Sequence, residues 1–339
     1  MIISDNITIG EVNMNNKSNS KIVGLGTYLP NRKLTNYALE KMVDTSDEWI
    51  VRRTGVRERR LAEKEEFSSD LAIKAVENLI ERYNVRVEDV DMVIVTTFTP
   101  DHFTPTVSAL VQGYFGMETA GTMDINSGCT GFVYGLCVAD SLITAGHSNK
   151  VLVIASEVAS KVLDYSDRNT CVLFGDAAVA MLVERTNEKG SFIASYFTSD
   201  GKLAQNVACS NLSDKVNGKE LDKKRLFQQE GKLLYEYVVK NIPEGVYSLL
   251  KRSDLTFDDI KWFVPHSANL RMIKAISQRL NFPMEKTLIS NEFYGNTSSA
   301  SIPLAIWMAV EESKIKSGDK MILYGFGAGL THGGVIIEW

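Results

Sequence analysis

Apolar and polar residues follow one another along this chain in two rhythms, which predict short strands separated by helices. Apolar residues that recur every three or four positions predict helices at 35–43 and 68–82. Residues 44–60 are charged and turn-rich, and the polar stretch 198–225 predicts a surface excursion. Compact apolar runs, which are typical of buried strands, occur at 21–28, 150–155, 320–324 and 333–339.

One unit of this pattern occurs twice, about 170 residues apart. Residues 87–97 form an acidic turn followed by a buried strand, and residues 257–266 repeat both features. Further on, a glycine-containing turn opens a helix in each copy, at Cys129 and at Asn296, and each helix precedes a strand. The repeat predicts an α/β protein of two similar lobes, with mostly parallel sheets covered by helices on both faces.

Cys129 lies where a strand-like stretch gives way to a helix. Apolar residues recur at helical spacing from Phe132 to Ile143, so we expect a buried helix to begin within one or two residues of Cys129. Unpaired N–H groups and the macrodipole at a helix N-terminus favour the thiolate, which is the nucleophilic form of cysteine. Gly128 and Gly131 would allow a ligand to approach closely. The alternative is that Cys129 is a small buried hydrophobic side chain.

Ligands of such proteins bind beyond the carboxyl ends of the strands. By this rule Cys129, His266 and Asn296 share one functional edge, whereas His266 taken alone would more often be a hydrogen-bonded core histidine. The glycine-rich turn at 325–330 has the appearance of a dinucleotide-binding loop, but too few residues follow it for the required helix and strand. It instead predicts a close approach of the backbone to a reacting group.

Composition narrows the classes of function. The 339 residues are 44% hydrophobic and carry a formal net charge of −5, which argues against general nucleic-acid binding. Four cysteines without a CxxC pair or metal-ligand spacing indicate reduced thiols and no metal site. Residues 1–20 indicate a flexible leader without the features of a secretory signal, and no apolar run is long enough for a membrane span. We therefore expect a soluble, cytoplasmic protein.

Five segments taken together resemble the β-ketoacyl-[acyl-carrier-protein] synthase III family, which has the thiolase fold. The resemblance covers 21–339 and implies a layered α-β-α-β-α architecture after the leader at 1–20. It divides the chain into a half at 21–190, which carries the cysteine, and a half at 191–339, which carries the histidine and asparagine. The segments are DTSDEWIVRRTGVRER at 44–59, CTGF at 129–132, FGDAA at 174–178, VPHSANLR at 264–271 and YGNTSSASIP at 294–303.

The resemblance also implies a reaction and the residues that perform it. Cys129 would be acylated by a primer acyl-CoA, and malonyl-acyl carrier protein would then lose CO₂ and condense with the acyl group, which initiates fatty-acid synthesis. His266 and Asn296 would donate hydrogen bonds that stabilise the enolate, a role that suits a neutral histidine. The backbone N–H groups of Cys129 and Ala328 would form the oxyanion hole. No cofactor is implied, because the CoA thioester is a substrate.

Other residues match the family's binding positions. A segment at 103–107 matches one that crosses the interface of a homodimer, with Thr104 where phenylalanine is frequent. The positions for the adenine and phosphate end of CoA are Thr45, Trp49, Arg53 and Arg168. Those along the pantetheine tunnel are Tyr235, Asn269 and Arg271. Those facing an acidic carrier protein are Ser267, Arg271, Lys274 and Arg279, although a run of charges is usually only a solvated helix face.

Three departures from the family and three alternatives remain open. The family commonly has Gln at Ser267, Gly at Ala328 and Trp at His332, differences that bear on primer choice and rate. The main alternative is a condensing enzyme of secondary metabolism with another acyl donor or acceptor. A non-catalytic acyl-binding protein is disfavoured by the intact Cys129, His266 and Asn296. A cysteine hydrolase would need a base beside the thiol and access for water.

Overall fold

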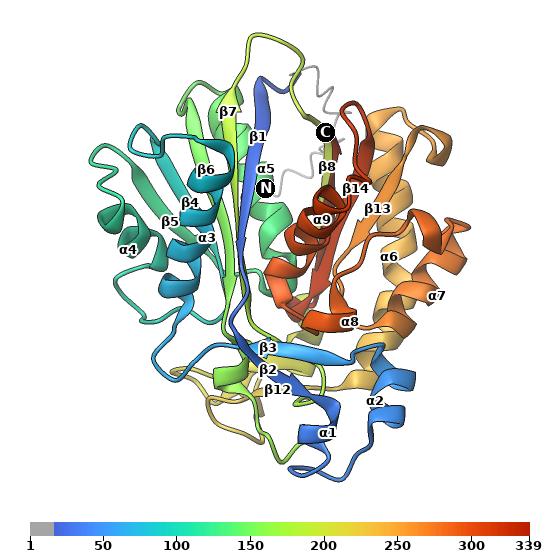
Figure 1. The fold of residues 1–339 in the computed structure, drawn as a ribbon. Coiled ribbons are helices and arrows are strands. Elements are labelled where there is room, and N and C mark those ends of the chain that lie inside the picture. The colour runs from blue at the N-terminus through green and yellow to red at the C-terminus, as the bar shows by residue number, and fades with distance from the viewer. Residues whose placement is uncertain (1–16) are drawn as a thin grey trace, which may run out of the picture.

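The computed structural model describes residues 17–339, so residues 1–16 of the predicted leader lie outside the described residues. The remaining part of the leader is tied to the protein, because the hydroxyls of Ser18 and Ser20 donate to Asp140. The described chain is built of five layers in the order helix, sheet, helix, sheet, helix (Figure 1). This is the thiolase-type architecture expected from the resemblance.

The first sheet has the strand order β1-β7-β6-β4-β5. β4 pairs in parallel with both β5 and β6, whereas β7 is antiparallel to β6 and to β1. α3 and α4 cover its outer face (Figure 1). These elements are β1 (Ser20–Tyr28), α3 (Ser68–Tyr83), β4 (Met92–Thr96), α4 (Val107–Tyr114), β5 (Gly121–Ile125), β6 (Lys150–Glu157) and β7 (Ala177–Arg185).

The second sheet has the strand order β13-β14-β15-β8, and α6 and α7 lie on its outer side (Figure 1). β13 and β14 are parallel, while β15 is antiparallel to β14 and to β8. These elements are β8 (Phe192–Ser199), α6 (Gly231–Ser253), β13 (Trp262–Pro265), α7 (Leu270–Leu280), β14 (Lys320–Gly327) and β15 (Thr331–Glu338).

Two helices fill the space between the sheets and form the centre of the core. α5 (Gly131–Thr144) packs on both sheets, and α9 (Ser301–Glu311) does the same. Their side chains are apolar on nearly every face, which is why they are buried between two layers instead of covering one. Short 3₁₀ turns precede both helices: η1 (Gly128–Thr130) before α5 and η6 (Ser298–Ala300) before α9. The two copies of the predicted repeat therefore place Cys129 and Asn296 at equivalent positions.

The remaining elements lie near the lower end of the molecule in Figure 1 or connect the layers. Longer connections contain η2 (Ala159–Val162), η3 (Gly201–Asn206), η4 (Phe257–Asp259), η5 (Met284–Lys286) and η7 (Ala328–Leu330). The short strands and helices are β2 (Arg32–Thr35), α1 (Asn36–Leu39), α2 (Asp47–Thr54), β3 (Glu58–Leu61), β9 (Val207–Cys209), β10 (Lys215–Val216), β11 (Lys219–Glu220), β12 (Phe227–Gln229) and α8 (Asn291–Tyr294).

Three sequence predictions about the fold need correction. The sheets are mixed and not mostly parallel, because each half ends with a strand that runs back beside its predecessor, and apolar runs do not encode strand direction. The turn-rich segment 44–60 contains helix α2 and most of strand β3, which pairs with β2. The helix capped by Thr35 ends at Leu39, although turn hydrogen bonds continue to Val43.

Candidate active site

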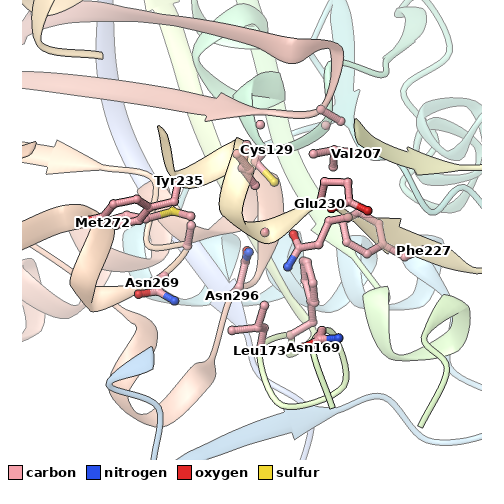
Figure 2. A pocket seen from close by; sticks show the side chains of 18 of the residues that line it. Cys129, Asn169, Leu173, Val207, Phe227, Glu230, Tyr235, Asn269, Met272 and Asn296 are labelled. Carbon is pink, nitrogen blue, oxygen red and sulfur yellow. The ribbon is translucent and has the colours of Figure 1, made fainter. Parts of the chain in front are cut away.

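The cavity that contains Cys129 has a volume of about 880 Å³ and opens between the two halves of the chain. Its floor is formed by Cys129 from η1, His266 from the segment after β13 and Asn296 from the segment before η6. Figure 2 shows the sulfur of Cys129 and the side chain of Asn296 directed toward the same space. The structure thus brings together the three residues that the sequence placed on one functional edge.

The backbone at Gly327 packs closely against Cys129. A Cβ atom on Gly327 would lie 3.2 Å from the Sγ atom and 3.0 Å from the Cβ atom of Cys129. Gly128, with φ of +50°, turns the chain into η1, and a Cβ there would lie 3.3 Å from that of Ala328. The glycine-rich turn therefore does bring backbone against the candidate nucleophile, as the sequence predicted.

Opposing effects act on the thiol of Cys129, which is half-buried. Burial raises its pKa to about 12, and the nearby carboxylate of Glu157 adds to the increase, while hydrogen bonds from Ser298 and from its own backbone oppose it. Burial and the helix N-terminus therefore act on the thiol in opposite directions, and the predicted activation of Cys129 stays a prediction.

His266 is a neutral, buried imidazole beside the thiol. Only 1% of its surface is exposed, and burial lowers its pKa to about 3. Its Nδ1 atom lies 2.6 Å from the hydroxyl oxygen of Ser301, and its ring meets that of Phe326 edge to face. Held in this way, His266 presents a neutral ring to the cavity at physiological pH.

The side-chain amide of Asn296 has a fixed orientation. Its Oδ1 atom accepts a hydrogen bond of 2.8 Å from the backbone N–H of Ser298. The backbone of Asn296 is held by Leu173 and Gly175 on the neighbouring segment. Because the carbonyl side of the amide is occupied, the NH₂ group is the part that faces the cavity (Figure 2).

Aromatic rings and guanidinium groups surround the mouth of the cavity. Trp49 lies between Arg53 and Arg168, whose guanidinium carbons are 5.7 and 5.3 Å from the ring centroid. Arg271 lies 5.9 Å from the ring of Tyr235. Asn269, which caps α7, also lines the cavity. Thr45 does not, so the structure brings six of the seven residues predicted to contact CoA to one opening.

The structure exposes three of the four residues predicted to face a carrier protein, and it buries Ser267. Arg271, Lys274 and Arg279 are exposed on α7 beside the mouth of the cavity. Ser267 is fully buried, and its hydroxyl accepts a hydrogen bond from the backbone N–H of Ser290. A partner protein cannot reach Ser267, so its assignment to that surface was wrong.

Ala328 and His332, the other two residues that differ from those common in the family, lie at different distances from the cavity. Ala328 lines the cavity next to Gly128. His332 is buried on the far side of the second sheet, where its Nδ1 atom lies 2.8 Å from the hydroxyl of Tyr324. His332 is not a lining residue, so its effect on primer choice could only be indirect.

Sequence reasoning missed two parts of the site. The stretch 198–225 is more than a surface excursion, because Ala204, Val207, Ala208, Cys209 and Val216 line the cavity. The signal was the small apolar group at 207–209, which forms β9 and pairs with β12. The second part is Glu157, a carboxylic acid at the end of an apolar strand and behind Cys129.

Residues 17–339 contain neither a candidate metal cluster nor a membrane-spanning helix. No cluster of three or more His, Cys, Asp or Glu side chains in this range is placed to hold a metal ion. No helix in the same range is long and apolar enough to cross a membrane.

This fold, with a cysteine, a histidine and an asparagine around one cavity, defines a condensing acyltransferase of the thiolase type. Residues 123–201 and 250–339 match the family described as 3-oxoacyl-[acyl-carrier-protein] synthase III and its C-terminal part. The chain belongs to the β-ketoacyl-[acyl-carrier-protein] synthase III family, as its relatives show at nearly full length.

Relatives named β-ketoacyl-[acyl-carrier-protein] synthase III 2 include the following two proteins. The protein of Halalkalibacterium halodurans is 49% identical over 96% of this chain and 98% of its own length. That of Bacillus subtilis is 50% identical over 95% of this chain and 99% of its own. The crystal structure of the Thermus thermophilus synthase III has a TM-score of 0.91 and 41% identity, and the match covers 94% of this chain and 99% of that chain.

Proposed function

We propose that this protein joins a primer acyl-CoA to malonyl-acyl carrier protein by decarboxylative Claisen condensation and thereby initiates fatty-acid synthesis. The observation that carries the proposal is the convergence of Cys129, His266 and Asn296 in one cavity of a synthase III fold. The names of the relatives favour this activity over a role in secondary metabolism.

In the first half of the reaction, Cys129 attacks the carbonyl carbon of the primer thioester and displaces CoA. The backbone N–H groups of Cys129 and Ala328 are the proposed oxyanion hole, and the position of Ala328 beside Gly128 supports this role. We assign the ring of Trp49, held between Arg53 and Arg168, to the adenine and phosphate end of CoA. Tyr235, Asn269 and Arg271 follow it toward the thiol as contacts of the pantetheine arm.

In the second half, the carboxylate of the malonyl group leaves as CO₂, and negative charge develops on the thioester oxygen. Asn296 offers its NH₂ group as one donor to that oxygen. His266 offers the Nε2 proton of the tautomer in which Nδ1 accepts from Ser301. A neutral imidazole suits this role, because it donates a hydrogen bond and, unlike an imidazolium, is too weak an acid to protonate the enolate.

Two protein partners are proposed, an acyl carrier protein and a second copy of this chain. Arg271, Lys274 and Arg279 on α7 form the proposed docking face for an acidic carrier protein in the cytoplasm. A homodimer is proposed because the segment 103–107, in which Phe103 is 68% exposed, matches a family segment that crosses the dimer interface.

Mass spectrometry of the intact protein tests the function directly. Incubation with a primer acyl-CoA should add one acyl group, and malonyl-acyl carrier protein should then remove it with release of CO₂. Cys129→Ser should abolish the addition, whereas Cys209→Ser, which replaces another cysteine of the cavity wall, should retain it. An acyl group found on Cys129→Ser protein would refute the assignment of the nucleophile.

A further inference from the structure

The orientation of the Asn296 amide depends on one backbone group. The Oδ1 atom of Asn296 accepts a hydrogen bond of 2.8 Å from the N–H of Ser298, and within residues 17–339 this is the one hydrogen bond that its side chain makes. The NH₂ group is thereby directed into the cavity (Figure 2). Any change that moves the N–H of Ser298 should therefore move the donor that Asn296 offers.

Ser298 holds this N–H in place with an unfavourable backbone conformation. Its φ angle is +51°, in the left-handed region that serine rarely adopts. Such a conformation persists only where the surroundings impose it. Ser298 is completely buried, and its hydroxyl donates a hydrogen bond of 3.0 Å to Oε1 of Glu157. Glu157 is therefore placed to hold Ser298 in this conformation.

Glu157 connects the two halves of the chain. It ends β6, is completely buried and turns its two oxygens toward different segments. Oε1 accepts from the hydroxyls of Ser298 and Ser299 and from the N–H of Ser299, all in η6. Oε2 accepts three hydrogen bonds from the turn after β4, donated by the hydroxyls of Thr97 and Thr99 and by the N–H of Phe98. One carboxyl group thus ties the turn after β4 to the segment that carries Asn296.

An amide of the same length cannot replace this carboxyl group without loss. The NH₂ group of a glutamine donates hydrogen bonds but does not accept them. In one orientation it would meet the N–H of Ser299, and in the other the N–H of Phe98. A hydroxyl can rotate to become an acceptor, whereas a backbone N–H cannot. The bond from Ser299 is the longer of the two, at 3.4 Å against 3.1 Å, so the clash should fall on η6.

The other proposed donor, His266, is held by a different residue. Its Nδ1 atom lies 2.6 Å from the hydroxyl of Ser301, the first residue of α9, and the backbone carbonyl of Ser301 accepts from the hydroxyl of Ser290. In the described part of the chain, no hydrogen bond joins Ser301 to Glu157. A disturbance at Glu157 should therefore reach Asn296 and spare His266.

We propose that Glu157 is a positioning residue for Asn296: by holding the N–H of Ser298 in place, it aims the amide at the thioester oxygen on which charge develops. The inference rests on the proposed function, because it takes decarboxylation as the step that Asn296 serves. Glu157 does not line the cavity, so its effect on the rate passes through Ser298 and Asn296.

The test measures both halves of the reaction, because a misplaced Asn296 should slow only one of them. Glu157→Gln keeps the length of the side chain and loses an acceptor, whereas Glu157→Asp keeps the carboxyl group and loses its reach. In both variants, release of ¹⁴CO₂ from malonyl-acyl carrier protein should fall by about tenfold to 10²-fold, with acylation by the primer close to the wild-type rate. Wild-type CO₂ release in Glu157→Asp would show that charge matters and not position, which overturns the proposal.

Double variants show whether Glu157 acts through Asn296. Once Asn296→Ala has removed the amide, adding Glu157→Gln should lower CO₂ release by less than about twofold further. Ser301→Ala, which loosens His266 instead, should combine with Glu157→Gln so that the two losses multiply. Losses that multiply in the Asn296 pair as well would contradict the positioning role.

Ser298→Gly and Ser298→Ala separate the backbone conformation from the hydroxyl. Both variants lack the hydroxyl, but glycine adopts a positive φ readily and alanine does not. Ser298→Gly should therefore retain more CO₂ release than Ser298→Ala, and the reverse order would refute the argument. Ser299→Ala is the matched control, because it removes a hydroxyl 2.7 Å from the same oxygen of Glu157 and leaves Ser298 in place. It should keep both wild-type rates.

Asp176→Asn controls for a general loss of stability. Asp176 is also completely buried and precedes the residue of β7 that pairs with Glu157. Its oxygens accept from the backbone N–H groups of Ala62 and Ser160. Asp176→Asn should lower the melting temperature, as Glu157→Gln does, but leave both half-reactions unchanged. An equal loss of both half-reactions in Glu157→Gln, or loss of CO₂ release in Asp176→Asn, would point to packing and overturn the proposal.

Thermal melting separates this proposal from the proposed function. Because Asn296 and Glu157 both bind Ser298, their double variant should lose less in melting temperature than the sum of the two single losses. A wild-type protein that releases no CO₂ from malonyl-acyl carrier protein would overturn the proposed function, while this coupling would still support the positioning of Asn296. Additive losses in melting temperature would overturn the positioning role in either case.

Discussion

Asn296→Ala should separate the two halves of the reaction. The structure gives the amide one donor group for the cavity, because Oδ1 is already occupied by the N–H of Ser298. Removal of one preorganised donor to a developing oxyanion typically lowers the rate by 10² to 10³, which corresponds to about 3 to 4 kcal/mol in the activation free energy. That loss should fall on decarboxylation, where the charge develops, and not on acylation by the primer.

The assay measures both halves on the same preparations. Acyl-enzyme is counted by intact mass after addition of a primer acyl-CoA, and release of ¹⁴CO₂ from malonyl-acyl carrier protein is followed from the acylated protein. Asn296→Ala should become acylated at close to the wild-type rate and release CO₂ at about 1% of that rate or less. Decarboxylation at the wild-type rate, or failure at acylation instead, would refute the assigned role of Asn296.

Two controls distinguish the lost donor from a disturbed fold. Asn296→Ala also leaves the buried N–H of Ser298 without an acceptor, which should cost about 1 to 3 kcal/mol of the free energy of unfolding. Asn296→Asp keeps an acceptor for that N–H, so it should retain stability and still lose decarboxylation. Thr297→Val alters the neighbouring residue, whose buried hydroxyl has no partner among the described residues, and should change neither rate.

The remaining predictions concern the partners. Trp49→Ala should raise KM for the primer acyl-CoA about tenfold with little change in kcat, since stacking of a base on an aromatic ring contributes about 1 to 3 kcal/mol. An unchanged KM in steady-state kinetics would show that Trp49 does not contact CoA. Lys274→Glu and Arg279→Glu should each raise KM for malonyl-acyl carrier protein at low salt and leave acylation by the primer acyl-CoA unchanged. A KM that changes with neither substitution nor with salt would contradict the proposed docking face. Light scattering should show a homodimer, and a fully active monomer would exclude it.

The sequence was sufficient for the parts of the site that depend on local signals. Cys129 and Asn296 follow turns that open apolar helices, and His266 follows a buried strand, so their common edge could be predicted from the repeat and from the geometry of strands and helices. The predicted start of the helix after Cys129 is confirmed by η1 and α5.

The other parts depend on contacts between distant segments, which one sequence does not encode locally. The pKa of Cys129 depends on how completely the two halves exclude water, and the buried Ser267 is hydrogen-bonded to Ser290, which lies 23 residues away in the chain. Glu157 ended an apolar run and could have been noticed as a charge in a predicted buried strand. Its hydrogen bond with Ser298, 141 residues away in the chain, could not be predicted from the sequence alone.

The missing side chain at Gly327 has a consequence for anyone who wishes to redesign the range of primers. One wall of the cavity is bare backbone against the sulfur of Cys129, so a methyl group there would have to displace the nucleophile by a few tenths of an ångström. Substitutions at that wall would therefore disturb the position of the thiol. Another part of the wall is built from the short side chains of Ala204, Val207 and Ala208. Larger or smaller residues at these three positions are the place to begin a search for altered chain-length selectivity.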